Sequence, residues 1–143
     1  MFGYTHPMLV QEVMSRSVIT LTPEQTLAEA IALLRTHRIR HLPVVDDSKL
    51  IGIVTDRDVK RATPSVLSGV DKTEYDRVLA TTRVAQFMTR EPMTVAPGAG
   101  LKATVKIMIE AKVGALPVVE ADHLVGILTE IDVLRVVLNL LPE

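Results

Sequence analysis

The sequence predicts a mixed α/β (α+β) fold made of two β-α-β-β-α repeats that pack pseudo-symmetrically, sheet to sheet. Three observations predict this fold. First, residues 14–61 align with residues 88–135 without a gap, and 16 of the 48 aligned pairs are identical, where roughly three are expected from ordinary composition. Second, apolar residues recur at helical spacing in both halves. Third, each half contains two short apolar runs joined by turn-forming residues.

The first helix of each repeat is predicted from apolar residues spaced i, i+4, i+7, which form one face. A short extended segment precedes each helix, at residues 18–21 and 93–95. Pro23 and Pro97 follow these segments, and we place them in the first helical turn, where proline is well tolerated. The residues of the apolar face are Leu27, Ile31 and Leu34 in the first repeat and Leu101, Val105 and Met108 in the second.

Two strands and a second helix complete each repeat. In the first repeat the apolar runs 42–45 and 50–54 flank the turn-forming residues 46–49, a pattern typical of a β-hairpin. The second helix is predicted to begin at Thr55, and at Thr129 in the second repeat. One such repeat is too small to bury its own sheet and helix faces, so we expect the two repeats to pack together.

The two repeats are predicted to span residues 8–62 and 84–141. Residues 63–83 include the loop-forming stretches Thr63-Pro64-Ser65 and Ser68-Gly69. We therefore interpret them as a connector between the repeats, in which residues 72–79 form a short helix. Residues 1–7 are expected to be a loose N-terminus.

Composition and charge exclude several classes of protein. Of the 143 residues, 48% are hydrophobic and 23% are charged, and the net charge is −1. These values exclude intrinsic disorder and disfavour a coat for nucleic acid or for an anionic membrane. The chain has no cysteine, which excludes disulfides and thiolate chemistry. Since no apolar stretch approaches the roughly 18 residues of a membrane span and residues 1–7 lack a secretion signal pattern, we expect a cytoplasmic protein with no nucleic-acid or membrane partner.

Three motifs occur twice, in the same order and at constant spacing. They are Met-(Ser/Thr)-Arg at 14–16 and 88–90, (His/Ala)-Leu-Pro-Val-Val at 41–45 and 115–119, and Gly-Ile-(Val/Leu)-Thr-x-x-Asp-Val at 52–59 and 126–133. This ordered set resembles the cystathionine β-synthase (CBS) domain, present twice, as in the tandem pair called a Bateman module. The resemblance covers about residues 8–140. Residues 56–65 further resemble stand-alone bacterial members related to acetoin-utilisation accessory proteins.

The resemblance implies a regulatory binding module that carries no catalysis and needs no cofactor. Family members often bind adenosine-containing ligands in clefts between the two repeats. AMP, ADP or ATP is the expected ligand here, with S-adenosylmethionine and NAD as less favoured ones. The resemblance assigns to cleft A Ile19, Thr20, Ile39, Arg40, His41, Pro43, Thr129 and Asp132. It assigns to cleft B Met93, Thr94, Val113, Gly114, Pro117, Thr55, Arg57 and Asp58.

The residue types suit such a ligand. A carboxylate can accept hydrogen bonds from both hydroxyls of a ribose, which is the role expected of Asp58 and Asp132. Thr55 and Thr129 stand at helix starts, where free N–H groups and the helix dipole favour a phosphate. Backbone groups at residues 19–20 or 93–94 could hydrogen-bond an adenine edge. Positive charge for a phosphate is available from Arg38, Arg40, His41 and Arg57, and arginine is the better bidentate partner.

A purely structural interpretation of the same residues stays open. Thr55-x-x-Asp58 and Thr129-x-x-Asp132 match a helix capping box, with Asp in place of the usual Glu. Such a cap stabilises a helix by about 1 kcal/mol without any ligand, and the two roles are compatible. The basic residues Arg35, His37, Arg38, Arg40 and His41 likewise fit an anion site or a helix C-terminus whose cations complement the dipole.

The two repeats differ where charge would matter. Gly114 and Ala115 of the second repeat align with Arg40 and His41 of the first, and Ile131 aligns with Arg57. One cleft could therefore bind a ligand while the other is vestigial.

Other kinds of site are disfavoured. His37 and His41 are four residues apart but straddle a predicted helix end and lack a carboxylate partner, which disfavours a metal site. Residues 98–103 have the form G-x-G-x-x-A, yet the aligned residues 24–29 contain no glycine, which disfavours a dinucleotide fingerprint. The sequence has no cysteine, no G-x-S-x-G element and no dense cluster of His and carboxylates, which disfavours an enzyme.

Residues 133–141 are more apolar than one buried helix face requires. They fit either a helix packed between the repeats or a dimer interface. We favour a homodimer, because an exposed apolar patch on so small a monomer is a liability. The resulting hypothesis is a module that senses an adenine nucleotide and passes the signal to an unidentified protein partner. The alternative is a structural protein-interaction module with vestigial clefts.

Overall fold

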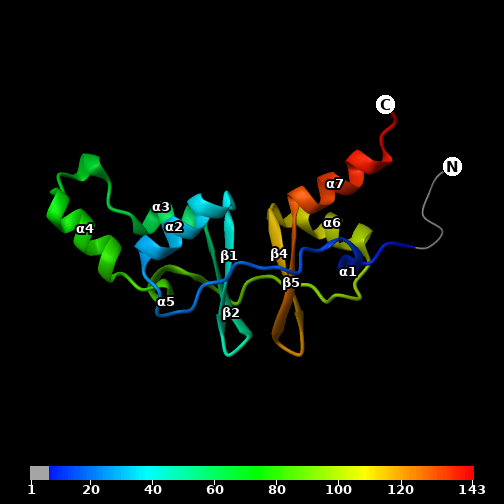
Figure 1. Cartoon of the computed structure of the whole chain (residues 1–143), viewed down its shortest axis with the longest axis horizontal. Helices are drawn as coiled ribbons and strands as arrows, with labels where there is room; N and C mark the ends of the chain where they lie inside the picture. The colour runs from blue at the N-terminus through cyan, green and yellow to red at the C-terminus, as the bar shows by residue number, and fades with distance from the viewer. Residues whose placement is uncertain (1–6) are drawn as a thin grey trace. The chain divides into compact units, whose positions relative to one another are not determined.

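The structure is a computed structural model that describes residues 7–143 in two compact units. Unit 1 contains residues 7–18 and 93–143, and unit 2 contains residues 19–92. Each unit combines helices with an antiparallel sheet, as the sequence predicts (Figure 1). The predicted loose terminus, residues 1–7, lies outside the described residues except for Pro7, which is exposed.

Unit 2 contains most of the first sequence repeat, the connector and the start of the second repeat. Strands β1 and β2 form a hairpin, and β3 pairs with β2 on its other side. Helices α2 and α3 contact each other, and α4 packs against α2. The elements are α2 (Leu27–His37), β1 (His41–Asp46), β2 (Lys49–Thr55), α3 (Asp56–Ala62), the 3₁₀ turn η1 (Val66–Ser68), α4 (Lys72–Thr81), α5 (Val84–Phe87) and β3 (Thr89–Arg90).

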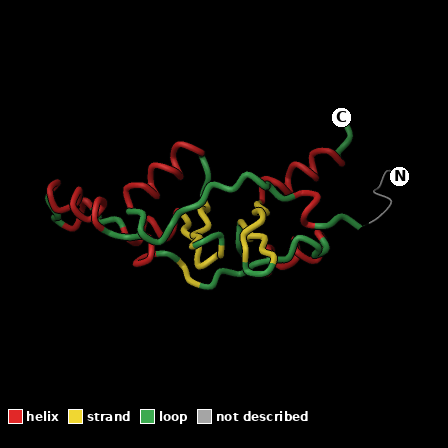
Figure 2. The backbone as a smooth tube through the Cα atoms, turned by 60° about the horizontal axis from the view of Figure 1, so that its bottom comes forward, coloured by secondary structure: helices red, strands yellow, loops and turns green. Residues whose placement is uncertain are grey.

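Unit 1 also consists of an antiparallel hairpin and helices, as unit 2 does. Its hairpin is formed by β4 and β5, and residue Ser15 makes an isolated antiparallel bridge to Ile127 of β5. Figure 2 shows the strands of both units joined by tight turns and flanked by helices. The elements are α1 (Val10–Val13), α6 (Leu101–Ala111), β4 (Ala115–Glu120), β5 (His123–Thr129) and α7 (Glu130–Leu140).

Both hairpins turn through two residues with positive φ. Asp47 and Ser48 have φ values of 51° and 69°, and Ala121 and Asp122 have 50° and 66°. Two consecutive left-handed residues make a turn whose twist matches that of the flanking strands. The predicted strands 42–45 and 50–54 are confirmed, and each extends by at least one residue at both ends.

The first helices begin four residues later than predicted. Helix α2 starts at Leu27 because the Thr26 hydroxyl accepts the Glu29 N–H at 3.2 Å and caps the helix. The side chain of Gln25 accepts the Thr22 N–H at 2.9 Å, so Pro23 lies in a preceding turn. The placement of Pro23 and Pro97 in the first helical turn was therefore wrong. The predicted extended segments are single parallel bridges, Leu21–Val44 and Val95–Val118.

The second helices and the connector helix agree with the predictions. Thr55 and Thr129 are the N-cap residues of α3 and α7. In the connector, α4 is capped by Asp71, whose carboxylate accepts the Glu74 N–H at 2.8 Å. Among the described residues, no helix is long and apolar enough to cross a membrane.

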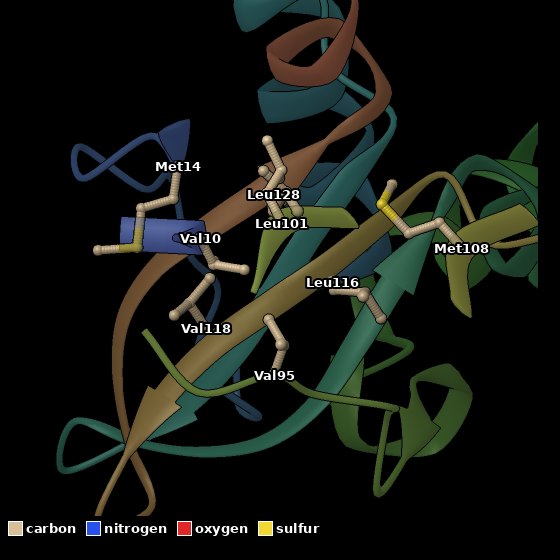
Figure 3. Packing of buried hydrophobic residues seen from close by; sticks show 8 residues of the cluster. All are labelled: Val10, Met14, Val95, Leu101, Met108, Leu116, Val118 and Leu128. Carbon is tan, nitrogen blue, oxygen red and sulfur yellow. The ribbon is translucent and has the colours of Figure 1, made fainter. Parts of the chain in front are cut away.

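Each unit has its own aliphatic core. In unit 1, α1 and α6 place Val10, Leu101 and Met108 against the inner face of the hairpin, where Leu116 and Leu128 are fully or almost fully buried (Figure 3). The unit 2 core consists of Leu21, Ala30, Leu42, Val44, Val54, Val84 and Met88. Since these side chains are almost all aliphatic, packing against the sheet rather than aromatic anchoring stabilises each unit.

The leading segments of the two repeats are exchanged between the units. Residues 8–18 pack in unit 1: the Val10 N–H donates to the Ala99 carbonyl at 2.9 Å, and the Leu101 N–H donates to the Met8 carbonyl at 2.8 Å. Residues 82–92 pack in unit 2, where the Val84 N–H donates to the Gln25 carbonyl at 2.7 Å. Each compact unit is therefore built from parts of both sequence repeats.

Candidate functional site

The centre of each predicted site is a buried carboxylate. Asp58 is 6% exposed and Asp132 is 4% exposed, and they are the only buried charged side chains in residues 7–143. Burying a carboxylate is costly unless hydrogen-bond donors surround it. The donors around Asp58 and Asp132 therefore determine what each carboxylate can do.

Both carboxylates close the predicted capping boxes. In unit 2, Asp58 Oδ2 accepts the Thr55 N–H at 2.9 Å and the Thr55 hydroxyl at 3.1 Å, while the Asp58 N–H donates back to that hydroxyl at 3.3 Å. In unit 1, Asp132 and Thr129 make the same three bonds at the same distances. The capping interpretation is thus confirmed, and it fixes the Oδ2 atom of each carboxylate.

A second hydroxyl, which sequence reasoning missed, reaches each carboxylate. The Ser15 hydroxyl donates to Asp132 Oδ1 at 2.9 Å, and the Thr89 hydroxyl donates to Asp58 Oδ1 at 3.1 Å. Ser15 and Thr89 are the middle residues of the two Met-(Ser/Thr)-Arg motifs. The signal available in the sequence is that the motif occurs twice, each time at the same spacing from the Thr-x-x-Asp motif of its repeat.

Glycine allows each motif to lie against its sheet. A Cβ at Gly126 would lie 2.7 Å from Met14 Sδ and 2.9 Å from the Ser15 carbonyl oxygen. A Cβ at Gly52 would meet Met88 Sδ and the Thr89 carbonyl oxygen at the same distances. Only glycine fits such a close backbone approach. The Gly of each Gly-Ile-(Val/Leu)-Thr motif therefore leaves room for the Met-(Ser/Thr) pair whose hydroxyl contacts the carboxylate.

The N–H groups expected to bind a phosphate are largely occupied within the chain. At the start of α3, the Asp56 N–H donates to the Arg40 carbonyl at 3.2 Å and the Asp58 N–H donates to the Thr55 hydroxyl. At the start of α7, the Glu130 N–H donates to the Gly114 carbonyl at 3.0 Å. The helix starts therefore connect to the residues before β1 and β4 rather than standing free.

Unit 2 brings together the predicted cleft A residues of the first repeat. The Leu21 N–H donates to the Pro43 carbonyl at 2.9 Å, which aligns residues 19–20 with the start of β1. His41 pairs with Thr55 in the β1–β2 register. Arg40 and His41 therefore lie beside Thr55, a residue predicted for cleft B.

Unit 1 gathers the corresponding residues of the second repeat without the charge. The Val95 N–H donates to the Pro117 carbonyl at 3.1 Å, and this aligns Met93 and Thr94 with β4. Val113 and Gly114 precede β4, and Ala115 pairs with Thr129. Unit 1 thus has the same frame as unit 2 but lacks basic residues at the two positions where unit 2 has Arg40 and His41.

The basic stretch before β1 divides into two parts. Arg35 and His37 lie in the last turn of α2, and Arg38 is its C-cap with a left-handed φ of 54°. These three residues fit the helix C-terminus interpretation. Arg40 and His41 lie beyond the helix, and Arg40 is exposed.

Unit 2 also contains a pocket of about 340 Å³ beside Asp58. It lies where α3 meets α5. Of its lining residues, only Asp58 was predicted as a site residue. The lining consists of Asp58, Arg61, Ala62, Thr82, Gln86 and Phe87.

The chain matches the model of a known protein family in both of its repeats. The family model of the CBS domain matches residues 10–65 and again residues 84–139. The chain belongs to the CBS domain family. The resemblance inferred from the three motifs is therefore confirmed. CBS-pair proteins are regulatory modules, and related pairs have been solved with adenosine ligands.

Curated relatives include both stand-alone CBS pairs and larger enzymes. A CBS domain-containing protein of Dictyostelium discoideum is 33% identical over 135 residues, with 93% of each chain covered. An inosine-5'-monophosphate dehydrogenase of Korarchaeum cryptofilum is 40% identical over 119 residues. The CBS pair spans only 22% of that enzyme's length, and this similarity shows no catalytic domain.

Solved CBS pairs have the same fold. A Vibrio cholerae protein described as the acetoin utilization protein AcuB has a TM-score of 0.79 and 35% identity, with 94% of this chain and 93% of that chain covered. CBSX2, solved in complex with AMP, has a TM-score of 0.77 and 28% identity over 92% of this chain and 97% of its own. A CBS pair solved with 5'-methylthioadenosine and S-adenosyl-L-methionine has a TM-score of 0.77 and 27% identity over 95% of this chain and 100% of its own.

Proposed function

We propose that this CBS pair is a regulatory module that binds an adenine nucleotide of the AMP, ADP and ATP class and passes its binding state to a protein partner. The observation that carries the proposal is the pair of buried carboxylates, Asp58 and Asp132, each held by hydroxyl and N–H donors in a chain of the CBS family. Two related CBS pairs, solved with AMP and with S-adenosyl-L-methionine, support the adenosine class.

The proposed ligand contacts are those predicted from the family. The term "set A" denotes the residues predicted for cleft A, and "set B" denotes those predicted for cleft B. In each set the carboxylate accepts hydrogen bonds from ribose hydroxyls, and backbone groups at residues 19–20 or 93–94 meet the base. Set A includes two basic residues, Arg40 and His41, whereas set B includes only Arg57.

The first experiment is a thermal-shift and calorimetry panel with AMP, ADP, ATP, S-adenosylmethionine and NAD. A ligand present at about 100 times its dissociation constant should stabilise the fold by roughly 2.7 kcal/mol, which is measurable as a higher Tm. A selective rise for one adenine nucleotide supports the proposal. A panel without any shift contradicts it and favours the alternative function, a protein-interaction module.

Removing one carboxylate tests the residue assignment. Asp132→Ala should weaken binding to set A by at least roughly tenfold, because charge-assisted hydrogen bonds to a ribose are worth about 1.5–3 kcal/mol each. Asp58→Ala should do the same for set B. Isothermal titration calorimetry of both variants measures the loss. Unchanged affinities in both variants would show that the carboxylates do not contact the ligand.

A matched control is needed because both carboxylates also cap helices. Loss of a cap costs about 1 kcal/mol of stability by itself. Asp71→Ala removes the capping carboxylate of α4, which belongs to neither set. This control should lower the Tm by a smaller amount, because Asp71 is exposed, and should leave nucleotide affinity unchanged.

We also propose that the chain acts as a homodimer through α7. Val133 and Val136 pack on the unit 1 core, whereas another face of the same helix is exposed, with Leu138 at 70% exposure. An apolar face of this size favours a covering partner, and a second copy is the simplest one. The exposed apolar residues of α7 and its end are Ile131, Leu134, Val137, Leu138, Leu140 and Leu141.

Sedimentation velocity tests the dimer. The double variant Leu134→Lys/Leu138→Lys should shift the protein from dimer to monomer, because two charges cannot be buried at the centre of an apolar interface without partners. The control variant Val66→Lys changes a side chain that is 78% exposed in the connector and should leave the dimer intact. A wild type that sediments as a monomer contradicts the proposal.

A further inference from the structure

We propose that Ser15 and Thr89 are positioning residues, each of which orients a carboxylate, Asp132 or Asp58 respectively, toward the ligand. This inference deepens the proposed function and rests on it. Neither hydroxyl belongs to set A or set B. Each comes from the leading segment of the opposite sequence repeat, separated from its carboxylate by 117 residues for Ser15 and by 31 residues for Thr89.

The two carboxylate oxygens of Asp132 accept hydrogen bonds from different residues. Oδ2 accepts the N–H and the hydroxyl of Thr129, which occupy both of its lone-pair directions. Oδ1 accepts the Ser15 hydroxyl at 2.9 Å. The Arg135 guanidinium, at 3.6 Å from Oδ1, is too distant for a hydrogen bond. Oδ1 therefore keeps one acceptor direction, and Ser15 decides where that direction points.

The hydroxyl itself is held by the backbone. Ser15 and Ile127 exchange two backbone hydrogen bonds, each of 2.9 Å, and the missing side chain of Gly126 lets this segment lie against β5. Ser15 is thus fixed by a strand-like bridge rather than by a loop. In unit 2, β3 places Thr89 opposite Ile53 in the same way. Supporting residues that are held rigidly in this way keep a binding group in a productive orientation.

The two positioning residues differ in the geometry of their hydrogen bonds to the carboxylates. The Thr89 hydroxyl lies between both oxygens of Asp58, at 3.1 Å from Oδ1 and 3.3 Å from Oδ2, and Thr89 is exposed. Ser15 makes one shorter bond to a single oxygen and is half-buried. We therefore expect the carboxylate of set A to be the better oriented of the two.

The test compares removal of each hydroxyl with its conservative replacement. Ser15→Ala should weaken binding of AMP or ATP, measured by calorimetry, by roughly tenfold, the loss expected for one hydrogen bond to a charged group. Ser15→Thr keeps the hydroxyl and should restore most of the affinity. Thr89→Val should have a smaller effect on set B, and Thr89→Ser should reverse it. Ser17→Ala, at an exposed serine two residues away, is the control and should bind like the wild type.

Two further outcomes separate this inference from the proposed function. If the wild type binds AMP or ATP and Ser15→Ala binds equally well, the positioning role is overturned while the proposed function stands. If the wild type binds neither, the proposed function fails and the ligand-positioning role fails with it. A double-mutant cycle of Tm with Ser15→Ala and Asp132→Asn needs no ligand. Additive losses of Tm in that cycle would show that the hydroxyl does not hold the carboxylate, and would overturn the inference independently.

Discussion

Replacing Gly126 with alanine is expected to lower the free energy of unfolding by about 3 kcal/mol, at the upper end of overpacking costs. The new Cβ would lie 2.9 Å from the Ser15 carbonyl oxygen, and a backbone atom paired with β5 cannot move away cheaply. It would also lie 2.7 Å from Met14 Sδ, which is part of the unit 1 core. Thermal unfolding followed by circular dichroism should show a Tm lower by roughly 10 °C.

The same molecule supplies the controls for this prediction. Gly52→Ala, the equivalent change in unit 2, should have a similar effect because its contacts are the same. Gly98→Ala adds a Cβ that meets nothing within 4 Å at an ordinary φ, so it should be neutral or slightly stabilising. A Gly126→Ala variant as stable as Gly98→Ala would show that the Met14–Ser15 segment is not held against β5.

Truncation of Leu128 is the other change with a large expected effect. Leu128 has no exposed surface and lies in the unit 1 core with Val10 and Leu101. Leu128→Ala removes buried methyl groups and leaves a cavity, which typically costs about 2–5 kcal/mol. Urea denaturation at 25 °C should show an unfolding midpoint at a clearly lower urea concentration, with an unchanged slope.

Leu67 is the matched control for this truncation. Its side chain is 93% exposed in the connector, so Leu67→Ala should change the free energy of unfolding by less than about 0.5 kcal/mol. The equivalent core variant in unit 2 is Leu42→Ala, since Leu42 also has no exposed surface. Equal stability of Leu128→Ala and Leu67→Ala would contradict the described core.

Much of the fold could be predicted because its elements are locally encoded. Helical spacing at Leu27, Ile31 and Leu34 and the turn at 46–49 are local signals, and both elements occur where expected. The start of α2 could not be inferred from Pro23, because the Thr26 hydroxyl, three residues after the proline, caps the helix. The sequence is compatible with a helix that begins at Pro23 and with one that is capped by Thr26, and only the structure distinguishes the two.

The candidate site could be predicted only in part, because some of its contacts are local in the sequence and others are not. Thr55 and Asp58 are three residues apart, so their capping box follows from the helix itself. Ser15 and Asp132 are 117 residues apart, and no local pattern encodes their hydrogen bond. The exchange of the leading segments between units is equally non-local. Gly126 was a readable signal, since a glycine inside a strand often marks a close approach of another backbone.

The exchange of leading segments has a consequence for a chain that is cut. A protease acting at the exposed Leu67 would separate residues 8–18 from the sheet of unit 1, and residues 82–92 from that of unit 2. Neither fragment would then contain every part of a complete unit. The nicked halves should stay associated under native conditions and should refold only when mixed. Expression of one repeat alone is therefore expected to yield an unstable polypeptide, because each compact unit needs residues from both repeats.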